Sequence, residues 1–195
     1  MKIYLLIIAL LSASAGYFFL IKPQGGQSML KLASNSFVDK GEIPQQYTCQ
    51  GENISPELHW DSDIEHVGSY VLIVDDPDAQ KVVGKTFVHW IAYVPERVNE
   101  LPEGASGKGI AFTGFNVELH EEPNDSGKTV YYGPCPPAGS GVHTYRFTLY
   151  AVKETVDQLI EQSKFEAPFT AEVFAKNMVG SLLGQARITG SYESK

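Results

Sequence analysis

Three short apolar runs, each rich in β-branched and aromatic residues, limit most strongly what this chain can fold into. They cover residues 69–75 (SYVLIVD), 87–94 (FVHWIAYV) and 144–152 (TYRFTLYAV). Runs of this length between turn-forming residues are typical of β-strands, and 18 glycines and 11 prolines punctuate the chain. We therefore expect a predominantly antiparallel β domain.

The side chains of a strand alternate between its two faces, so these runs also predict which residues lie together. In the second run, His89 falls on the same face as Ile91 and Tyr93, opposite Trp90. In residues 144–152, the odd-numbered residues share one face, which begins with an aromatic side chain. Each strand is therefore expected to contribute an apolar face to the core.

Helical signals come late in the chain. Thr155 and Gln158 match a capping box, in which each residue satisfies a backbone group of the other, and Thr170 precedes a second apolar run that includes Phe174. Residues 186–192 read as a closing strand. We expect one or two short peripheral helices near the C-terminus, followed by this last strand.

The N-terminal segment differs from the rest in composition. Residues 3–21 contain no charge, and Lys2 and Lys22 flank them. Two interpretations remain open: a signal peptide cleaved after the small residues 13–15, or a helix of 19 residues that spans a membrane. Both predict an extracytoplasmic protein, whether periplasmic, secreted or membrane-anchored. Residues 1–28 are the signal peptide or anchor with its linker, and residues 29–195 form one domain.

The net charge of −8 narrows the class of partner. A negative chain repels nucleic acid at long range, and no run of basic residues counters this. We expect no nucleic-acid partner. Any anion must be held by local donors within a pocket, and membrane contact would come through residues 3–21 if they are not cleaved.

Acidic residues follow the first strand directly. Asp75, Asp76 and Asp78 end a buried run, and an extended backbone would place Asp76 and Asp78 on the same side. A solvated acidic turn explains this cluster when it is taken alone. The alternative is a site in which crowded carboxylates act on neighbouring groups.

Two further polar features lie on strands. His89 interrupts an apolar strand, where a hydrogen-bonded core histidine is the simpler interpretation. Residues 132–142 form a loop rich in glycine and proline, which predicts a stiff backbone that another group can approach closely. His143 and Tyr145 follow it at strand spacing, so both donors share a face where the loop meets the strand.

Taken together and in this order, the clusters resemble the phosphatidylethanolamine-binding protein family, in particular its bacterial branch, which is also described as Raf kinase inhibitor-like. The family motif D-P-D-A-P matches residues 76–79, with Gln80 in place of the last proline. The H-W strand matches residues 89–90, the glycine-proline loop matches 133–137, and G-x-H-x-Y matches 141–145. The bacterial branch is also matched at residues 43–44, 47–49, 53–60 and 183–186, and the likeness covers about residues 30–193.

The resemblance implies a central antiparallel sheet packed on a smaller sheet, with a small pocket for phosphate-like or carboxylate-like anions. Matched position by position, seven residues line this ligand-binding pocket: Asp76, Asp78, His89, Gly133, Pro136, His143 and Tyr145. The expected ligand is a phosphate-bearing small molecule or a lipid head group. We expect the carboxylates to hydrogen-bond both histidines and favour imidazolium, which then donates to the anion together with the Tyr145 hydroxyl.

Three other functions compete with non-catalytic binding. A hydrolase could use Ser140, His143 and Asp76, but the chain lacks the G-x-S-x-G elbow around Ser140. A metal site could use the two histidines and the carboxylates, but no tight ligand spacing occurs. We expect no catalytic residue, no metal and no cofactor. The main alternative is a protein-interaction module that inhibits a kinase or a protease through a large face.

The two cysteines leave a choice open. Cys49 and Cys135 can pair in an oxidising compartment or remain buried as free thiols, and both lie in motifs that the resemblance covers.

Overall fold

In the computed structural model, which describes residues 29–108, 110–112, 115–117, 119–162 and 169–195, six strands form the main sheet. Their order is β2-β11-β10-β4-β5-β9, and every neighbouring pair is antiparallel except β2 with β11. In that order the strands span Gly41–Glu42, Leu182–Tyr192, His143–Val152, Ser69–Asp76, Phe87–Pro95 and His120–Glu121. The three apolar runs of the sequence thus form three strands of the main sheet, as predicted.

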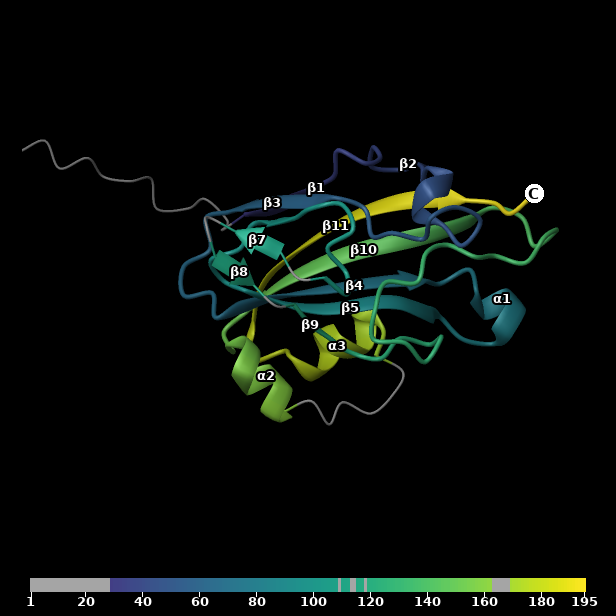
Figure 1. The fold of residues 1–195 in the computed structure, drawn as a ribbon. Helices are drawn as coiled ribbons and strands as arrows, with labels where there is room; N and C mark the ends of the chain where they lie inside the picture. The colour runs from purple at the N-terminus through teal and green to yellow at the C-terminus, as the bar shows by residue number, and fades with distance from the viewer. Residues whose placement is uncertain (1–28, 109, 113–114, 118, 163–168) are drawn as a thin grey trace, which may run out of the picture.

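A smaller sheet packs on one side of the main sheet, and two helices pack on the other (Figure 1). The smaller sheet has the order β1-β3-β6, with bounds Leu30–Ala33, Leu58–Ser62 and Glu100–Leu101. A separate antiparallel pair joins β7 (Ile110–Phe112) to β8 (Phe115–Val117). The predicted fold class, a central antiparallel sheet packed on a smaller one, is confirmed.

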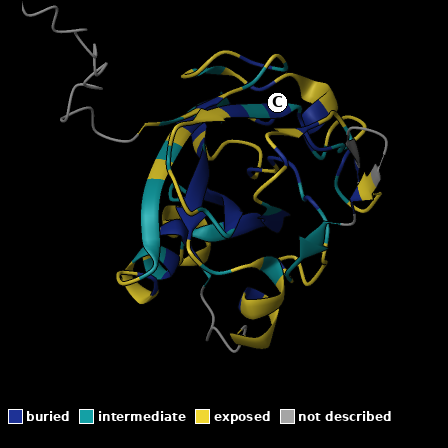
Figure 2. Ribbon diagram, turned by 90° about the vertical axis from the view of Figure 1, so that its left-hand side faces the viewer, coloured by how far each residue is buried: buried dark blue, intermediate teal, exposed yellow. Residues whose placement is uncertain are grey.

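Each face of the main sheet has its own apolar core. Between the two sheets, Trp60, Leu72 and Phe147 are buried together. On the opposite face, Tyr150 and Phe174 belong to a second core beneath the helices. Figure 2 shows the result, with buried strands at the centre and exposed residues on the outer loops and helices. Burial of this apolar surface is the main favourable term for such a domain.

The two late helices form where the sequence predicts them. In α2 (Val156–Gln162), the Thr155 backbone N–H donates to the Gln158 side chain at 2.9 Å, and the Gln158 N–H donates to the Thr155 hydroxyl at 3.4 Å. In α3 (Ala171–Asn177), the Thr170 hydroxyl accepts a hydrogen bond from the Val173 N–H. These bonds satisfy N–H groups that the first turn of a helix leaves without partners.

Two short helices were not predicted. The 3-10 helix η1 spans Gln45–Tyr47, and α1 spans Gln80–Val83 immediately after the acidic cluster. Their length gives no periodic signal, since each is about one turn. The left-handed Gly84 ends α1, with φ of 79°.

A β-bulge changes the face that His89 occupies. Val74 pairs with Trp90, but the next residue, Asp75, pairs with Val88, so His89 is an extra residue opposite β4. Val88 therefore lies in the core beneath the helices together with Ile91. Strict alternation predicts His89 on the face of Ile91 and opposite Trp90, and the bulge overturns that prediction around His89.

Asp75 anchors α3 to the sheet. Its carboxylate is fully buried and accepts hydrogen bonds from Arg146 at 2.7 and 2.8 Å and from the Ala171 backbone N–H at 3.1 Å. Burial raises the pKa of Asp75, whereas the bonds from Arg146 act to lower it. Glu172 binds the other side of the guanidinium, so one cation joins a strand to a helix.

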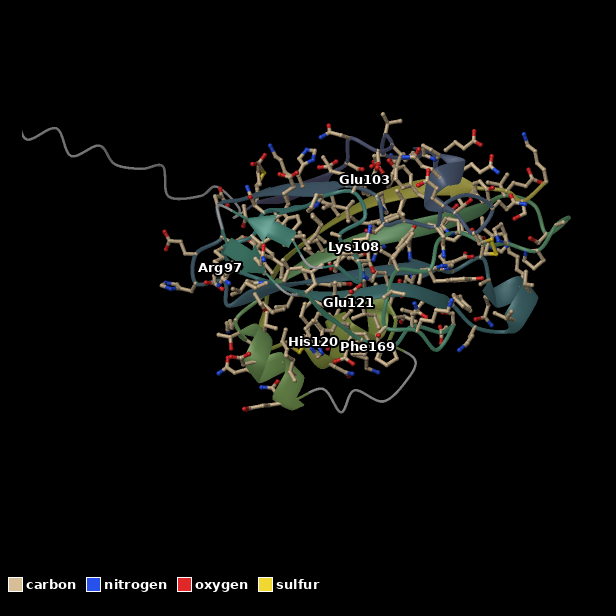
Figure 3. The ribbon with its side chains drawn as sticks, viewed as in Figure 1. Arg97, Glu103, Lys108, His120, Glu121 and Phe169 are labelled. Atoms are coloured by element: carbon tan, nitrogen blue, oxygen red, sulfur yellow. A yellow bond between two sulfur atoms is a disulfide. The ribbon has the colours of Figure 1, made fainter. Side chains whose placement is uncertain are left out.

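Glu121 ties the loop after β6 to the edge of the sheet (Figure 3). Its carboxylate accepts hydrogen bonds from Trp90 and Ser106 at 2.5 Å each and from the Gly107 N–H at 2.8 Å.

The expected signal peptide or anchor in residues 1–28 lies outside the described residues. No helix within the described part of the chain has the length and apolar character needed to cross a bilayer.

Candidate functional site

A cavity of about 160 Å³ opens at one end of the main sheet, beside α1. Figure 1 shows that β4 leads into α1 and that β5 starts from the same end. The cavity wall combines buried polar groups with apolar side chains, and it consists of Asp76, Ala79, Val82, Val83, Phe87, His89, Tyr132, Cys135, Pro136, Pro137, His143 and Tyr145. The volume is small beside pockets for drug-sized ligands, which occupy roughly 300–1,000 Å³.

A buried carboxylate–imidazole pair lies at the centre of this wall. The Asp76 Oδ2 and the His143 Nδ1 are 2.7 Å apart, and each side chain is only 4% exposed. The other oxygen of Asp76 accepts the backbone N–H groups of Asp78 at 2.8 Å and Ala79 at 3.1 Å. Because the carboxylate only accepts, the His143 Nδ1 carries the proton, and its Nε2 is the atom left for a ligand.

His89 has a different partner. Its Nδ1 lies 2.6 Å from the carbonyl oxygen of Tyr132, which can only accept, so the Nδ1 carries the proton. Burial lowers the pKa of His89 to about 4, although the Tyr132 carbonyl and the charge of Asp76 oppose this effect. The ring is therefore neutral at pH 7. The prediction that a carboxylate bonds His89 and holds it as imidazolium is wrong, because the bulged strand presents the ring to a backbone carbonyl.

The Tyr145 hydroxyl is buried in the cavity wall and has no hydrogen-bond partner among the described residues. Burial raises its pKa, and the negative charge of Asp76 raises it further. The backbone of Cys135 partly offsets this rise without meeting the distance and angle of a hydrogen bond. A buried hydroxyl without a partner costs free energy, so a ligand atom that bonds it gains that much affinity.

The loop that forms one wall is fixed to the segment around η1. A disulfide joins Cys49 to Cys135, with 5.4 Å between the Cα atoms, and the Cys49 N–H donates to the Pro134 carbonyl at 3.1 Å. The Gly133 N–H donates to the Asn53 side chain at 2.8 Å. A Cβ at Gly133 would lie 2.2 Å from the Tyr47 carbonyl oxygen, so only glycine fits there. The choice left open for the cysteines is thus resolved in favour of the disulfide.

The structure brings five of the seven predicted residues together around the cavity: Asp76, His89, Pro136, His143 and Tyr145. Asp78 and Gly133 are not part of the wall. Asp78 lies beyond the end of β4, so strand alternation does not apply to it, and its carboxylate accepts the Thr144 N–H at 3.0 Å and binds Lys81 at 3.1 Å. These bonds lower the pKa of Asp78 against the opposing effect of burial.

Apart from Pro136, the apolar part of the wall was not predicted. Val82 and Val83 of α1 are exposed at the cavity, and Phe87 and Tyr132 lie against the His89 ring, with centroids 4.8 and 5.9 Å from it. Only the position of Tyr132 beside the glycine-proline loop offered a signal in the sequence. The valines belong to a helix too short to predict.

The arrangement can bind a small polar group between donors and an apolar rim. Histidine and tyrosine atoms converge on the cavity, and charge-assisted bonds from a protonated His143 would favour an anion. Within the described ranges, no group of three or more His, Cys, Asp or Glu side chains is arranged to hold a metal ion.

Comparisons with a family model and with individual relatives agree with one another. The model of the phosphatidylethanolamine-binding protein family matches residues 33–193. A UPF0098 protein of Pyrococcus abyssi is 37% identical over 171 residues, which cover 88% of this chain and 89% of that protein. A candidate lipoprotein of Mycobacterium tuberculosis, LppC, is 35% identical over 171 residues, which cover 88% of this chain and 76% of the relative.

Solved structures agree with these relatives. Escherichia coli YbcL, described as a member of the mammalian PEBP family, matches with a TM-score of 0.68 and 26% identity, over 85% of this chain and 99% of YbcL. A phosphatidylethanolamine-binding protein homologue from Chlamydia trachomatis matches with a TM-score of 0.64 and 30% identity, over 85% of this chain and 98% of the homologue.

The disulfide generates a prediction about stability. Replacing both Cys49 and Cys135 with serine should lower the free energy of unfolding by up to about 4 kcal/mol, because the unfolded chain loses a cross-link between distant residues. Urea denaturation of the double variant and the wild type measures this difference. Thiol titration of the unfolded, unreduced wild type should find no free cysteine, and two titratable thiols would exclude the bridge.

Proposed function

Because the chain belongs to the phosphatidylethanolamine-binding protein family, we propose that its cavity binds the anionic group of a phosphate compound or lipid head group without catalysing a reaction. The observation that carries this proposal is the buried His143–Asp76 pair beside the partnerless Tyr145 hydroxyl. Two polar groups that are held in place and leave atoms for the cavity constitute a binding site that needs little reorganisation.

The tension between an anion and a carboxylate is resolved by the geometry of the pair. One oxygen of Asp76 bonds His143 and the other accepts two backbone N–H groups, so a hydrogen-bond donor offsets the negative charge at each oxygen. A protonated His143 then lies between the carboxylate and the ligand, and donates to each. Asp76 acts here as a positioning residue, because it reaches the ligand only through the imidazole.

The same geometry supports binding rather than catalysis. Ser140, the nucleophile of the rival hydrolase reading, donates its hydroxyl to the Pro137 carbonyl at 2.7 Å. It is not part of the cavity wall, whereas His143 is. A nucleophile must lie within hydrogen-bond reach of its base, and Ser140 is instead engaged on the outer side of the loop.

The proposal extends to an extracytoplasmic location, in which residues 1–28 are a signal peptide or membrane anchor. The uncharged run of residues 3–21, the disulfide and the candidate lipoprotein among the relatives support it. Fractionation of cells that express the whole chain should recover the domain in the membrane fraction or as a shorter exported form. A soluble, full-length cytoplasmic protein is the result that contradicts this location.

His143→Ala should weaken the binding of phosphorylethanolamine by about 1.5–3 kcal/mol, because the ligand loses a charge-assisted hydrogen bond. Calorimetric titration of the wild type and the variant measures the difference.

The matched control is His59→Ala. His59 also bonds a carboxylate, that of Glu57, at 2.7 Å, but His59 is on β3, Glu57 directly precedes that strand, and neither lines the cavity. The control variant should bind like the wild type. A wild type that shows no phosphate binding would instead favour a protein-interaction surface as the functional site.

Asp76→Asn should weaken binding as well, although the substitution removes a negative charge near the ligand. The His143 ring loses the carboxylate that accepts its Nδ1–H and fixes its orientation, so its Nε2 is no longer held toward the ligand. The effects of Asp76→Asn and His143→Ala on the binding free energy should not add, because both substitutions break the same hydrogen-bonded pair. Calorimetry with phosphorylethanolamine tests this, and tighter binding by the variant would mean that Asp76 only repels the ligand.

A further inference from the structure

His89 presents a hydrogen-bond acceptor to the cavity. The Nδ1 donates to the Tyr132 carbonyl at 2.6 Å, and the buried ring is neutral, so the Nε2 holds a lone pair and no proton. No described residue forms a hydrogen bond to this Nε2, and the backbone of Gly133 acts on the ring without meeting hydrogen-bond geometry. Because His89 lines the cavity, the Nε2 is the ring nitrogen left for a ligand.

Charged and titratable groups surround the His89 ring, and none of them bonds its Nε2. From β4, Asp76 faces it, and from the loop before Tyr132, Asp125 adds a second negative charge. The carboxylate of Asp125 is itself bound by Lys85 at 2.6 Å and by the Val88 N–H at 2.7 Å. From β10, the Tyr145 ring packs edge-on at 5.2 Å, and His143 lines the same cavity. Both charges act to raise the pKa of His89, but neither carboxylate bonds the ring, and the larger effect of burial leaves the Nε2 without a proton.

The cavity therefore offers two donors and one acceptor. A protonated His143 and the Tyr145 hydroxyl can each donate, whereas His89 can only accept. A fully ionised anion has only acceptor oxygens, so its approach would set an oxygen lone pair against the lone pair of His89. A ligand that satisfies all three groups needs two accepting oxygens and one O–H.

We propose that the cavity selects the singly protonated form of a phosphomonoester, whose P–O–H group donates to the Nε2 of His89. This inference rests on the proposed anion-binding function and makes His89 the residue that determines specificity. The two remaining phosphoryl oxygens accept from His143 and Tyr145. A phosphodiester carries the same single charge but has an alkyl group in place of the hydrogen, so it leaves His89 without a donor.

Methyl phosphate and dimethyl phosphate form the decisive pair. At pH about 5.5, both are mainly monoanions, since the second pKa of a phosphomonoester is about 6. NMR titration of the full domain should show that methyl phosphate binds about tenfold or more tightly, the cost of one unmade hydrogen bond to a buried group. Equal affinities would overturn the selection of the protonated form but leave the anion site intact. Binding of neither compound would overturn the anion site itself and this inference with it.

The pH dependence separates the proton on the ligand from protons on the protein. Above the second pKa of the ligand, the affinity for methyl phosphate should fall about tenfold per pH unit, because the bound form needs one more proton than the free dianion. Methylphosphonate loses its second proton at higher pH, so its affinity should begin to fall at correspondingly higher pH. A midpoint common to both ligands would assign the proton to the protein and contradict the proposal.

A variant tests His89 directly. His89→Gln replaces an obligate acceptor by an amide that can also donate. The preference for methyl phosphate over dimethyl phosphate should shrink several-fold, and a thermal melt checks that the variant is folded. Independently of the variant, the ¹⁵N spectrum of wild-type histidines should show His89 as the neutral Nδ1–H tautomer at pH 7. A ring protonated at the Nε2 would exclude the acceptor role.

Lipid and soluble sources of the monoester are distinguished with vesicles. Phosphatidic acid is a lipid phosphomonoester, and phosphatidylglycerol is a diester of the same sign of charge. Flotation with phosphatidic acid vesicles that methyl phosphate abolishes would identify a lipid ligand. Methyl phosphate binding without flotation would identify a soluble one. Equal flotation with both lipids, insensitive to methyl phosphate, would contradict selection at this cavity.

Discussion

Two consecutive carboxylates at the end of β4 position the groups that lie on the two faces of the main sheet. Successive side chains of a strand point in opposite directions, so Asp75 and Asp76 serve different cores. Asp75 is buried toward the helices, where it binds Arg146 and the first N–H of α3. Asp76 is buried toward the cavity, where it binds His143. Both partners come from β10, three residues apart, so the register between β4 and β10 fixes the helix and the site at once.

The sequence was sufficient for those parts of the fold that repeat a local pattern. The odd-numbered residues of β10, from Tyr145 to Ala151, are buried between the sheets as their alternation predicts. The capping residues Thr155 and Thr170 begin α2 and α3 where expected. Such signals depend on neighbours in the chain, which a sequence displays directly. The smaller sheet followed only from the family resemblance, because strands of two to five residues carry little pattern of their own.

The positions of the site residues show which features strand alternation predicts and which depend on contacts between distant segments. His143 and Tyr145 were placed correctly because they lie on an uninterrupted strand. His89 reaches the cavity only because an unpaired residue in β5 shifts the alternation, and that bulge depends on pairing with β4. The partner of His89 is a backbone carbonyl of Tyr132, 43 residues away, which no residue type reveals. Asp78 lies outside the cavity wall, since the chain leaves β4 before reaching it.

The link between Cys49 and Cys135 spans 86 positions of the chain, and the strands β3 to β9 all lie within the loop that it closes. A single proteolytic cut anywhere inside that loop leaves the two products covalently joined. The fragments cannot diffuse apart, so β4 and β5, which carry Asp76 and His89, remain tethered to the strand that carries His143. Outside a cell, where proteases are abundant, a nicked molecule of this kind would keep every component of its cavity in one covalent unit.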